Sequence, residues 1–368
     1  TLFYLMCSAG GALGGLMVAL VCPWLFDSYF EMNLCNVAGF ALAALVLASD
    51  AGALKPVRDA NVWNATRPRP FPLRAVTVCL LGLGVVMIVN AELIKPAYSS
   101  TDAAQRNFYG VVSIKSDATD RAGERLIAMV HGQIIHGVQF DSLERRGEPT
   151  TYYHRQSGVG QVLKWHHQRR PGPLHVGAVG MGVGTIAAYG RPRDRYRFYE
   201  INPAVIEYAE QRFSFLSDSA AEVTIVPGDA RLSLENEPPQ RFDVLVLDAF
   251  SVDAVPAHLL TTQAMAVYLR HLNDKGVIAV HVSNDYLDLR PVIAGLAAEY
   301  GLACVYIDTP GDRDNWKFRS KWMLLANDTA LLESPEIAKL ANQAQVRDVS
   351  PVVWTDDFNN LLHVLKKP

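Results

Sequence analysis

Beyond residue 150 the chain alternates short apolar runs with segments of helical periodicity. Apolar runs of about 4–8 residues between turn residues are typical of strands that are buried on both faces. Strands that alternate with helices predict an α/β fold with a parallel, doubly wound, Rossmann-like sheet. The predicted strands are 174–179, 196–199, 223–226, 242–247, 276–283, 303–307 and 321–326, and the predicted helices are 158–168, 259–272 and 289–300.

A different pattern precedes this sheet. Short strand-like runs cover 108–114, 125–131 and 133–138, with a turn at His131-Gly132. They predict a small antiparallel β-region within 96–150, ahead of the Rossmann-like domain at 151–368.

Residues 1–95 are dominated by apolar stretches. Because about 20 apolar residues cross a bilayer, we expect transmembrane helices at about 3–26, 34–53 and 73–94. Buried helices of a soluble protein are the alternative. The chain starts at Thr1, already inside an apolar run, so we expect it to be processed or to have further transmembrane helices upstream.

The composition argues against nucleic-acid binding and against a metal site. The chain has 368 residues, of which 50% are hydrophobic, and a net charge of −3. This balance, without a basic cluster interleaved with aromatic residues, argues against nucleic-acid binding. The five cysteines form no CxxC pair and His166-His167 lacks partners at ligand spacing, so we expect no metal site.

Chemistry-bearing residues follow four successive strands of the predicted sheet. The first strand ends in a glycine-rich loop, and each of the next three ends beside an acidic residue. The glycines are Gly180, Gly182 and Gly184, and the acidic residues are Glu200, Asp229 and Asp248. Ligands of open α/β sheets bind beyond the carboxyl ends of the strands, so these residues should share one crevice.

Their spacing favours an adenosyl ligand. Glu200 lies 20 residues after Gly180, the interval at which an acidic residue reaches ribose hydroxyls. Asp229 could accept a hydrogen bond from an adenine amino group. No Gly-Lys-Ser/Thr follows the loop, and its third glycine stands one position early for a dinucleotide fingerprint. We therefore prefer S-adenosylmethionine, or its decarboxylated form, over NAD, and keep a degenerate structural copy of the loop as the alternative.

Several motifs resemble the aminopropyltransferase (spermidine synthase) family, in particular its membrane-attached bacterial branch. The resemblance covers about 100–330 and implies a β-rich amino-terminal part followed by a methyltransferase-like sheet. It is carried by His131-Gly132 through Gln139, Tyr152-Tyr153-His154, the glycine loop with Glu200, Gly228-Asp229-Ala230, the block 248–261 (DAFSVDAVPAHLLT) and Trp354-Thr355-Asp356-Asp357.

The resemblance also implies a reaction and roles for residues. In this family an amine attacks the carbon next to a sulfonium, which transfers an aminopropyl group and releases methylthioadenosine, a step of polyamine biosynthesis. Asp248 matches the carboxylate that accepts the amine proton, Asp253 an amine-holding partner, and Tyr153 a tyrosine of the amine site. Gln139 is placed near the donor tail and Ala230 in the donor-binding motif. From the residues alone, Asp248 is also compatible with a helix N-cap.

Three positions depart from the family pattern. Val183 stands where soluble members carry an aspartate in the glycine loop, His131 replaces an aspartate, and Arg155 replaces an acidic residue. Fewer carboxylates weaken recognition of a polycationic acceptor and of decarboxylated S-adenosylmethionine. Intact S-adenosylmethionine therefore remains open as the donor.

Three hypotheses follow for the function. The first is a membrane-anchored transferase acting on a small amine, and the second is an S-adenosylmethionine-dependent methyltransferase or S-adenosylmethionine-cleaving enzyme on the same fold. The third is a non-catalytic ligand-binding subunit of a membrane complex. We expect a protein of the bacterial inner membrane that forms a homo-oligomer or has further transmembrane helices upstream. Basic residues in loop 50–74 indicate an outward-facing domain, but the donor is a cytoplasmic metabolite, which favours the cytoplasm.

Overall fold

The computed structural model describes residues 2–50, 101–132, 134–169, 171–249, 256–341 and 348–366, with the isolated positions 77, 81–85, 87 and 346. The chain divides into two compact units, Thr1–Val111 and Val112–Pro368, and each is described by itself.

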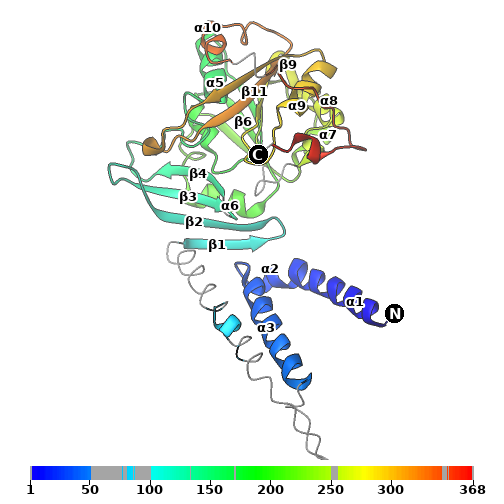
Figure 1. The fold of residues 1–368 in the computed structure, drawn as a ribbon. Helices are drawn as coiled ribbons and strands as arrows, with labels where there is room; N and C mark the ends of the chain where they lie inside the picture. Colours follow the sequence, from blue (N-terminus) through cyan, green and yellow to red (C-terminus); the bar gives the residue numbers. More distant parts are fainter. Residues whose placement is uncertain are drawn as a thin grey trace, which may run out of the picture. The chain divides into compact units, whose positions relative to one another are not determined.

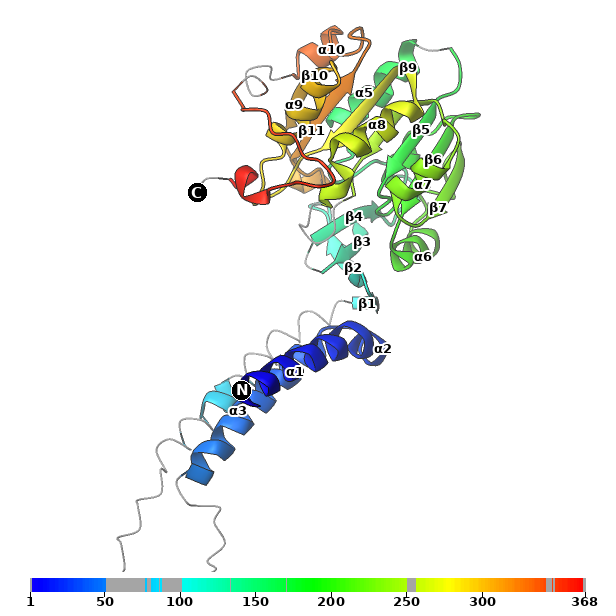
Figure 2. The same cartoon turned by 90° about the vertical axis from the view of Figure 1, so that its right-hand side faces the viewer.

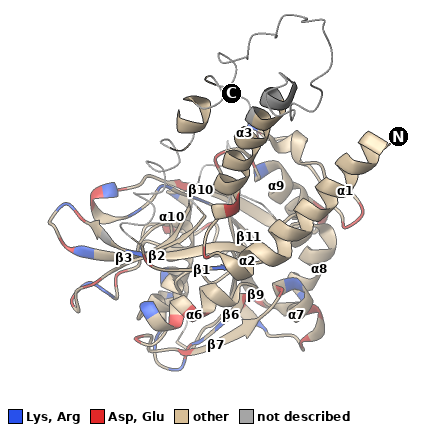
Figure 3. Cartoon of the chain, turned by 90° about the horizontal axis from the view of Figure 1, so that it is seen from below, with Lys and Arg blue, Asp and Glu red and all other residues tan. Residues whose placement is uncertain are grey.

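The first unit begins with a long apolar helix. It consists of α1 (Leu2–Leu16), a π-helical turn η1 (Met17–Val21) and α2 (Cys22–Leu25). Together these cover Leu2–Leu25, the one helix in the described part of the chain that is long and apolar enough to cross a membrane, with a mean hydropathy of 2.0. Figure 3 shows α1 without a basic or acidic residue along its length.

The other two predicted spans have different outcomes. Helix α3 (Phe30–Asp50) overlaps the second one, whereas most of 73–94 lies outside the described residues. The structure thus provides one candidate span rather than three. Within this unit, the buried guanidinium of Arg106 on β1 (Thr101–Asn107) donates to both carboxylate oxygens of Glu31 on α3, at 2.8 and 2.7 Å.

The second unit starts with the predicted antiparallel β-region. Strands β2 (Gly110–Thr119), β3 (Arg125–His131) and β4 (Ile134–Phe140) pair antiparallel in sequence order. Their inner faces pack around a small core of Leu126, Ala128, Val138 and Phe140. The antiparallel pairing is as predicted, although β2 begins and ends later than the predicted run 108–114.

A seven-stranded sheet follows, of which Figure 1 labels β6, β9 and β11. The strand order is β10-β11-β9-β8-β5-β6-β7. Its strands are β5 (His175–Val179), β6 (Arg195–Glu200), β7 (Glu222–Pro227), β8 (Phe242–Leu247), β9 (Leu272–His281), β10 (Ala303–Thr309) and β11 (Ser320–Ala326). Strands β5 to β9 pair parallel, but β11 runs antiparallel to both of its neighbours. The prediction of a wholly parallel sheet is therefore wrong for β11. It follows β10 without a crossover helix, and a direct connection brings the chain back in the opposite direction.

Helices cover both faces of this sheet (Figures 1 and 2). Helix α5 packs against β8, β10 and β11. On the opposite face α8 contacts both α7 and α9. The helices are α5 (Gly158–Arg169), η2 (Thr185–Tyr189), α6 (Pro203–Arg212), α7 (Ala230–Asn236), η3 (Ala257–Leu259), α8 (Thr262–His271), α9 (Arg290–Glu299), η4 (Arg313–Asn315), α10 (Pro335–Ala338) and η5 (Leu361–Val364). Every residue of β8 is buried, which explains why five of its six residues are apolar. The sixth, Asp243, is buried with a hydrogen-bond partner: its carboxylate accepts from the His175 N–H at 2.9 Å.

Candidate active site

The predicted rim of chemistry-bearing residues forms at one edge of the sheet. Because β5 to β8 run parallel, their carboxyl ends share this edge. The backbone ladder continues past the strand ends: Asp248 N–H donates to Val179 O at 2.9 Å, and Gly228 N–H to Glu200 O at 2.8 Å. These bonds fix the backbone from which Glu200, Asp229 and Asp248 project, so the sheet brings them to the same edge.

The carboxylate of Asp248 is held from two sides. The Tyr153 hydroxyl donates to Oδ2 at 2.5 Å, and Nδ1 of His281 lies 2.7 Å from Oδ1. The Asp248 side chain is 5% exposed. Burial and the negative charge of Asp248 raise the pKa values of Tyr152 and Tyr153 well above their usual value, so both hydroxyls stay protonated as donors. The geometry is that of an oriented, buried carboxylate.

His281 is a site residue that the sequence analysis did not identify. Parallel pairing sets Leu247 of β8 opposite Val280 of β9. The next residues along the two strands, Asp248 and His281, are therefore neighbours. The His281 ring stacks on Tyr152 with centroids 4.4 Å apart and an interplanar angle of 20°. The strand-end rule that selected Asp248 applies equally to β9, and it could have found His281.

Glu200 fixes the glycine loop. Its Oε2 accepts from the Met181 N–H at 3.0 Å and its Oε1 from the Asn202 N–H at 2.9 Å. Burial raises the pKa of this carboxyl, against the effect of these hydrogen bonds. The three loop glycines all adopt positive φ: Gly180 at 87°, Gly182 at 54° and Gly184 at 78°. The chain continues from the loop as a five-residue 3-10 helix, η2.

Asp229 and Ala230 begin α7. Asp229 is the N-cap, and its side chain accepts from the Leu232 N–H at 2.9 Å. Its other oxygen lies 3.0 Å from Nε2 of His258. Ala230 is buried as the first helical residue. An adenine amino group would have to share or replace the His258 contact.

Gln139 and Val183 both have partners within the second unit, Gln139 through hydrogen bonds and Val183 through packing. The Gln139 amide donates to Arg146 O at 2.9 Å and to Ser214 Oγ at 3.1 Å, and it accepts from Ser214 N–H at 2.9 Å. Val183 is buried, and its methyl groups occupy the space next to Gly137 where a side chain would otherwise stand. An apolar, buried Val183 offers no carboxylate to a donor amine. Asp253, the remaining predicted residue, lies outside the described residues.

A cavity of about 570 Å³ opens beside Asp248. Its size is within the range of about 300–1,000 Å³ that is usual for small-molecule sites. Burial lowers the pKa of His136 in its wall to about 4, so this imidazole is neutral at physiological pH. The cavity is lined by Ile134, Ile135, His136, Tyr152, Asp248, His281, Ser283, Asn284, Asp285, Arg313, Phe318 and Arg319.

Asp356 of the closing motif has a structural contact that the sequence did not indicate. Arg231 on α7 donates to its two carboxylate oxygens at 2.7 and 2.6 Å, and the Thr261 hydroxyl donates at 2.8 Å. The Arg231 hydrogen bond lowers the pKa of Asp356 to about 2. These bonds tie the carboxyl-terminal segment to α7 and to the N-cap of α8.

Replacing Asp356 with asparagine is expected to reduce the free energy of unfolding by about 1 kcal/mol, a small value because the carboxylate is 37% exposed and screened by solvent. The folded-state pKa lies below the unfolded-state value of 3.8, so the carboxylate stabilises the fold above about pH 4 and loses this effect as the pH falls towards 2. Urea unfolding at pH 7 and pH 3 measures both effects. Asp357→Asn, at the exposed neighbouring position, is the matched control, and an equal loss in both variants would contradict the prediction.

Comparison with known proteins identifies relatives of this fold. No family model matches the chain. Over 116 residues the chain is 28% identical to a polyamine aminopropyltransferase from Vibrio vulnificus, a match that covers 30% of this chain and 38% of that relative. The fold is similar to that of a probable spermidine synthase from Corynebacterium glutamicum, with a TM-score of 0.54 and 16% identity over 73% of this chain and 98% of that chain.

These matches confirm the resemblance to the aminopropyltransferase family and the methyltransferase-type α/β fold. The chain spans 38% of the length of the curated relative.

Proposed function

We propose that the protein is a membrane-anchored, spermidine synthase-like transferase that uses decarboxylated S-adenosylmethionine to aminopropylate an amine. The observation that carries this proposal is the oriented Asp248 carboxylate at the edge of a cavity of suitable size. The resemblance to aminopropyltransferases supports the same reaction.

Asp248 would serve the chemical step as a proton acceptor. The amine nitrogen forms a bond to the carbon next to the sulfonium, the C–S bond breaks, and its electron pair neutralises the sulfur as methylthioadenosine leaves. Asp248 takes the proton that the amine loses, a contribution of about 10²–10⁴-fold for a well-placed base. Tyr153 and His281 hold its two oxygens, which reduces the reorganisation needed when substrate binds. Asp253 would hold the amine.

The donor would bind along the sheet edge next to Asp248. The Gly180–Gly184 loop leaves room for its nucleoside, Glu200 would accept from the ribose, and Asp229 with Ala230 would contact the adenine. Gln139 would approach the donor tail. These roles require the carboxylates to exchange some of their present backbone and histidine partners for ligand hydroxyl and amino groups.

The anchoring would place this chemistry at the bacterial inner membrane. Helix Leu2–Leu25 supports one span. The donor is a cytoplasmic metabolite, so the 151–368 domain would face the cytoplasm. We propose a homo-oligomeric state for the anchored protein.

A second function on the same scaffold has specific support. Val183 provides no carboxylate for the amine of a decarboxylated donor, and Arg313 and Arg319 line the cavity beside Asp248. Arg319 is already paired with Asp308, so Arg313 is the cation of this lining that would pair with a substrate carboxylate, beside the carboxylates of Asp248 and Asp285. Methyl transfer from intact S-adenosylmethionine, or its intramolecular cleavage, is therefore the alternative.

The released nucleoside separates these reactions. We expect purified protein with decarboxylated S-adenosylmethionine and a panel of amines to release methylthioadenosine only when an acceptor is present, as measured by liquid chromatography and mass spectrometry. Adenosylhomocysteine from the intact donor as the sole nucleoside would contradict aminopropyl transfer. Methylthioadenosine formed without any amine would indicate intramolecular cleavage.

A further inference from the structure

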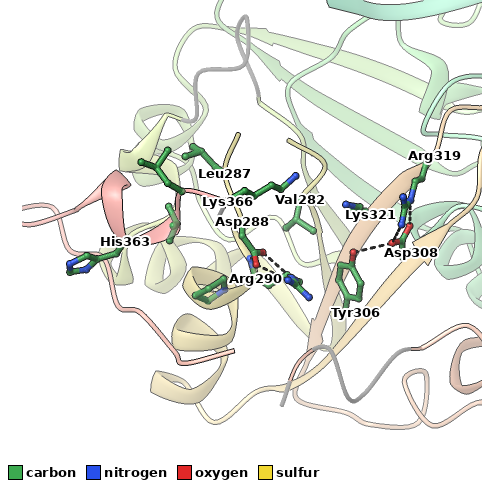
Figure 4. A pocket seen from close by; sticks show the side chains of 13 residues that line it. Val282, Leu287, Asp288, Arg290, Tyr306, Asp308, Arg319, Lys321, His363 and Lys366 are labelled. Carbon is green, nitrogen blue, oxygen red and sulfur yellow. Dashed lines mark hydrogen bonds and ion pairs between the residues drawn. The ribbon is translucent and has the colours of Figure 1, made fainter. Parts of the chain in front are cut away.

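A second cavity, of about 530 Å³, lies at the same edge of the sheet over strands β9, β11 and β10 (Figure 4). We call it the C-terminal pocket. It is lined by Val282, Leu287, Asp288, Arg290, Pro291, Tyr306, Asp308, Arg319, Lys321, His363, Val364, Leu365 and Lys366. It shares only Arg319 with the lining of the cavity beside Asp248.

The carboxyl-terminal segment builds one wall of this pocket. Asp288 N–H donates to Val364 O at 2.7 Å, and Lys366 N–H donates to Tyr286 O at 2.8 Å. The Lys366 ammonium also donates to the carbonyl of Asn284. Val364 is buried, so the segment is anchored by packing as well as by hydrogen bonds. These contacts hold Lys366 in place at the pocket, and Figure 4 shows it among the lining side chains.

Positive charge exceeds negative charge around the pocket. Arg290 makes a two-point ion pair with Asp288, at 2.8 and 2.6 Å. Arg319 does the same with Asp308, at 2.8 and 2.6 Å. Both carboxylates are thus already matched by an arginine. The two remaining cations of the lining, Lys321 and Lys366, make no ion pair with any residue that the structure describes.

The charged form of Lys321 is disfavoured by its surroundings in the pocket. Its side chain stands on β11 and is partly buried. Burial lowers the pKa of Lys321, and the nearby cations Lys366, Arg319 and Arg290 lower it further, whereas Asp308 opposes them. The unpaired ammonium groups of the partly buried Lys321 and the exposed Lys366 repel one another, and a bound anion would relieve this repulsion.

We infer that the C-terminal pocket binds a small organic anion with at least two phosphate or carboxylate groups, held by Lys321 and Lys366. Two ammonium groups without ion-pair partners supply charge and donors for such oxygens. The volume suits an organic molecule better than a single inorganic ion. Leu287 and Val282 add apolar surface for its carbon skeleton. This site is separate from the proposed transfer reaction.

Calorimetric titration of the full chain in detergent tests the inference. Citrate and inorganic pyrophosphate serve as probes, at constant ionic strength. We expect saturable binding of one anion per chain for at least one probe. Lys321→Gln and Lys366→Gln should each weaken it about tenfold, because each removes one charged hydrogen bond. Lys275→Gln, an exposed lysine near the start of β9, is the matched control and should bind as the wild type does.

Two results would overturn the inference: the absence of saturable binding of either probe, or equal affinity in the wild type and both pocket variants. Circular dichroism of each variant confirms that a loss of binding does not come from unfolding. Asp248→Asn is expected to bind the anion normally. Anion binding without any transfer activity would therefore refute only the proposed function, and activity without anion binding would refute only this inference.

Discussion

Asp248→Asn is expected to lower kcat for methylthioadenosine release by about 10³-fold, within the range for loss of a positioned base. The amide cannot accept the amine proton. Its NH₂ group would also face either the Tyr153 hydroxyl or the ring of His281, where the carboxylate now offers an acceptor. The measurement is the initial rate of nucleoside release at saturating donor and amine.

Asp274→Asn provides the matched control. Asp274 is exposed near the start of β9, away from the carboxyl end of that strand, where His281 lies. This variant should keep the wild-type rate, and both variants should keep the wild-type melting temperature within a few degrees. A wild-type rate in Asp248→Asn would show that Asp248 is not the proton acceptor.

The strands of the central sheet could largely be predicted from the sequence because each is a compact apolar run between turn residues. The predicted 242–247 coincides with β8, whose residues are all buried. Strand direction is less accessible to such patterns. The alternation of strands and helices predicted that 321–326 is parallel. Only the three-residue 3-10 helix η4 lies between β10 and β11, with no α-helix to cross over the sheet, and β11 is antiparallel. The sequence between 309 and 320 has no helical periodicity, and this could have indicated that β11 runs antiparallel.

The candidate site could be predicted in its location but not in its hydrogen bonds. Strand ends located Glu200, Asp229 and Asp248, since that rule depends only on the order of elements. The partners depend on residues that are distant in sequence. Gln139 bonds Ser214, 75 residues away, and no local pattern encodes such a choice.

Gly180→Ala is expected to have the second large effect, a loss of about 3–5 kcal/mol in the free energy of unfolding together with most of the transfer activity. Gly180 has a φ of +87°, which side chains rarely adopt. An added Cβ would stand 2.3 Å from the carbonyl oxygen of Asp248. This contact is with backbone, so no rotamer change relieves it, and the strand end that carries Asp248 must shift.

Gly172→Ala separates this effect from the general cost of removing a glycine. A Cβ at Gly172 would meet nothing within 4 Å, so this variant should unfold and react like the wild type. Urea unfolding and the rate of methylthioadenosine release measure the two consequences separately. If Gly180→Ala folds with wild-type stability, the glycine loop does not approach the end of β8 as closely as the structure shows. If it is destabilised but fully active, that approach stabilises the fold without positioning Asp248, and the carboxylate must be oriented by Tyr153 and His281 alone.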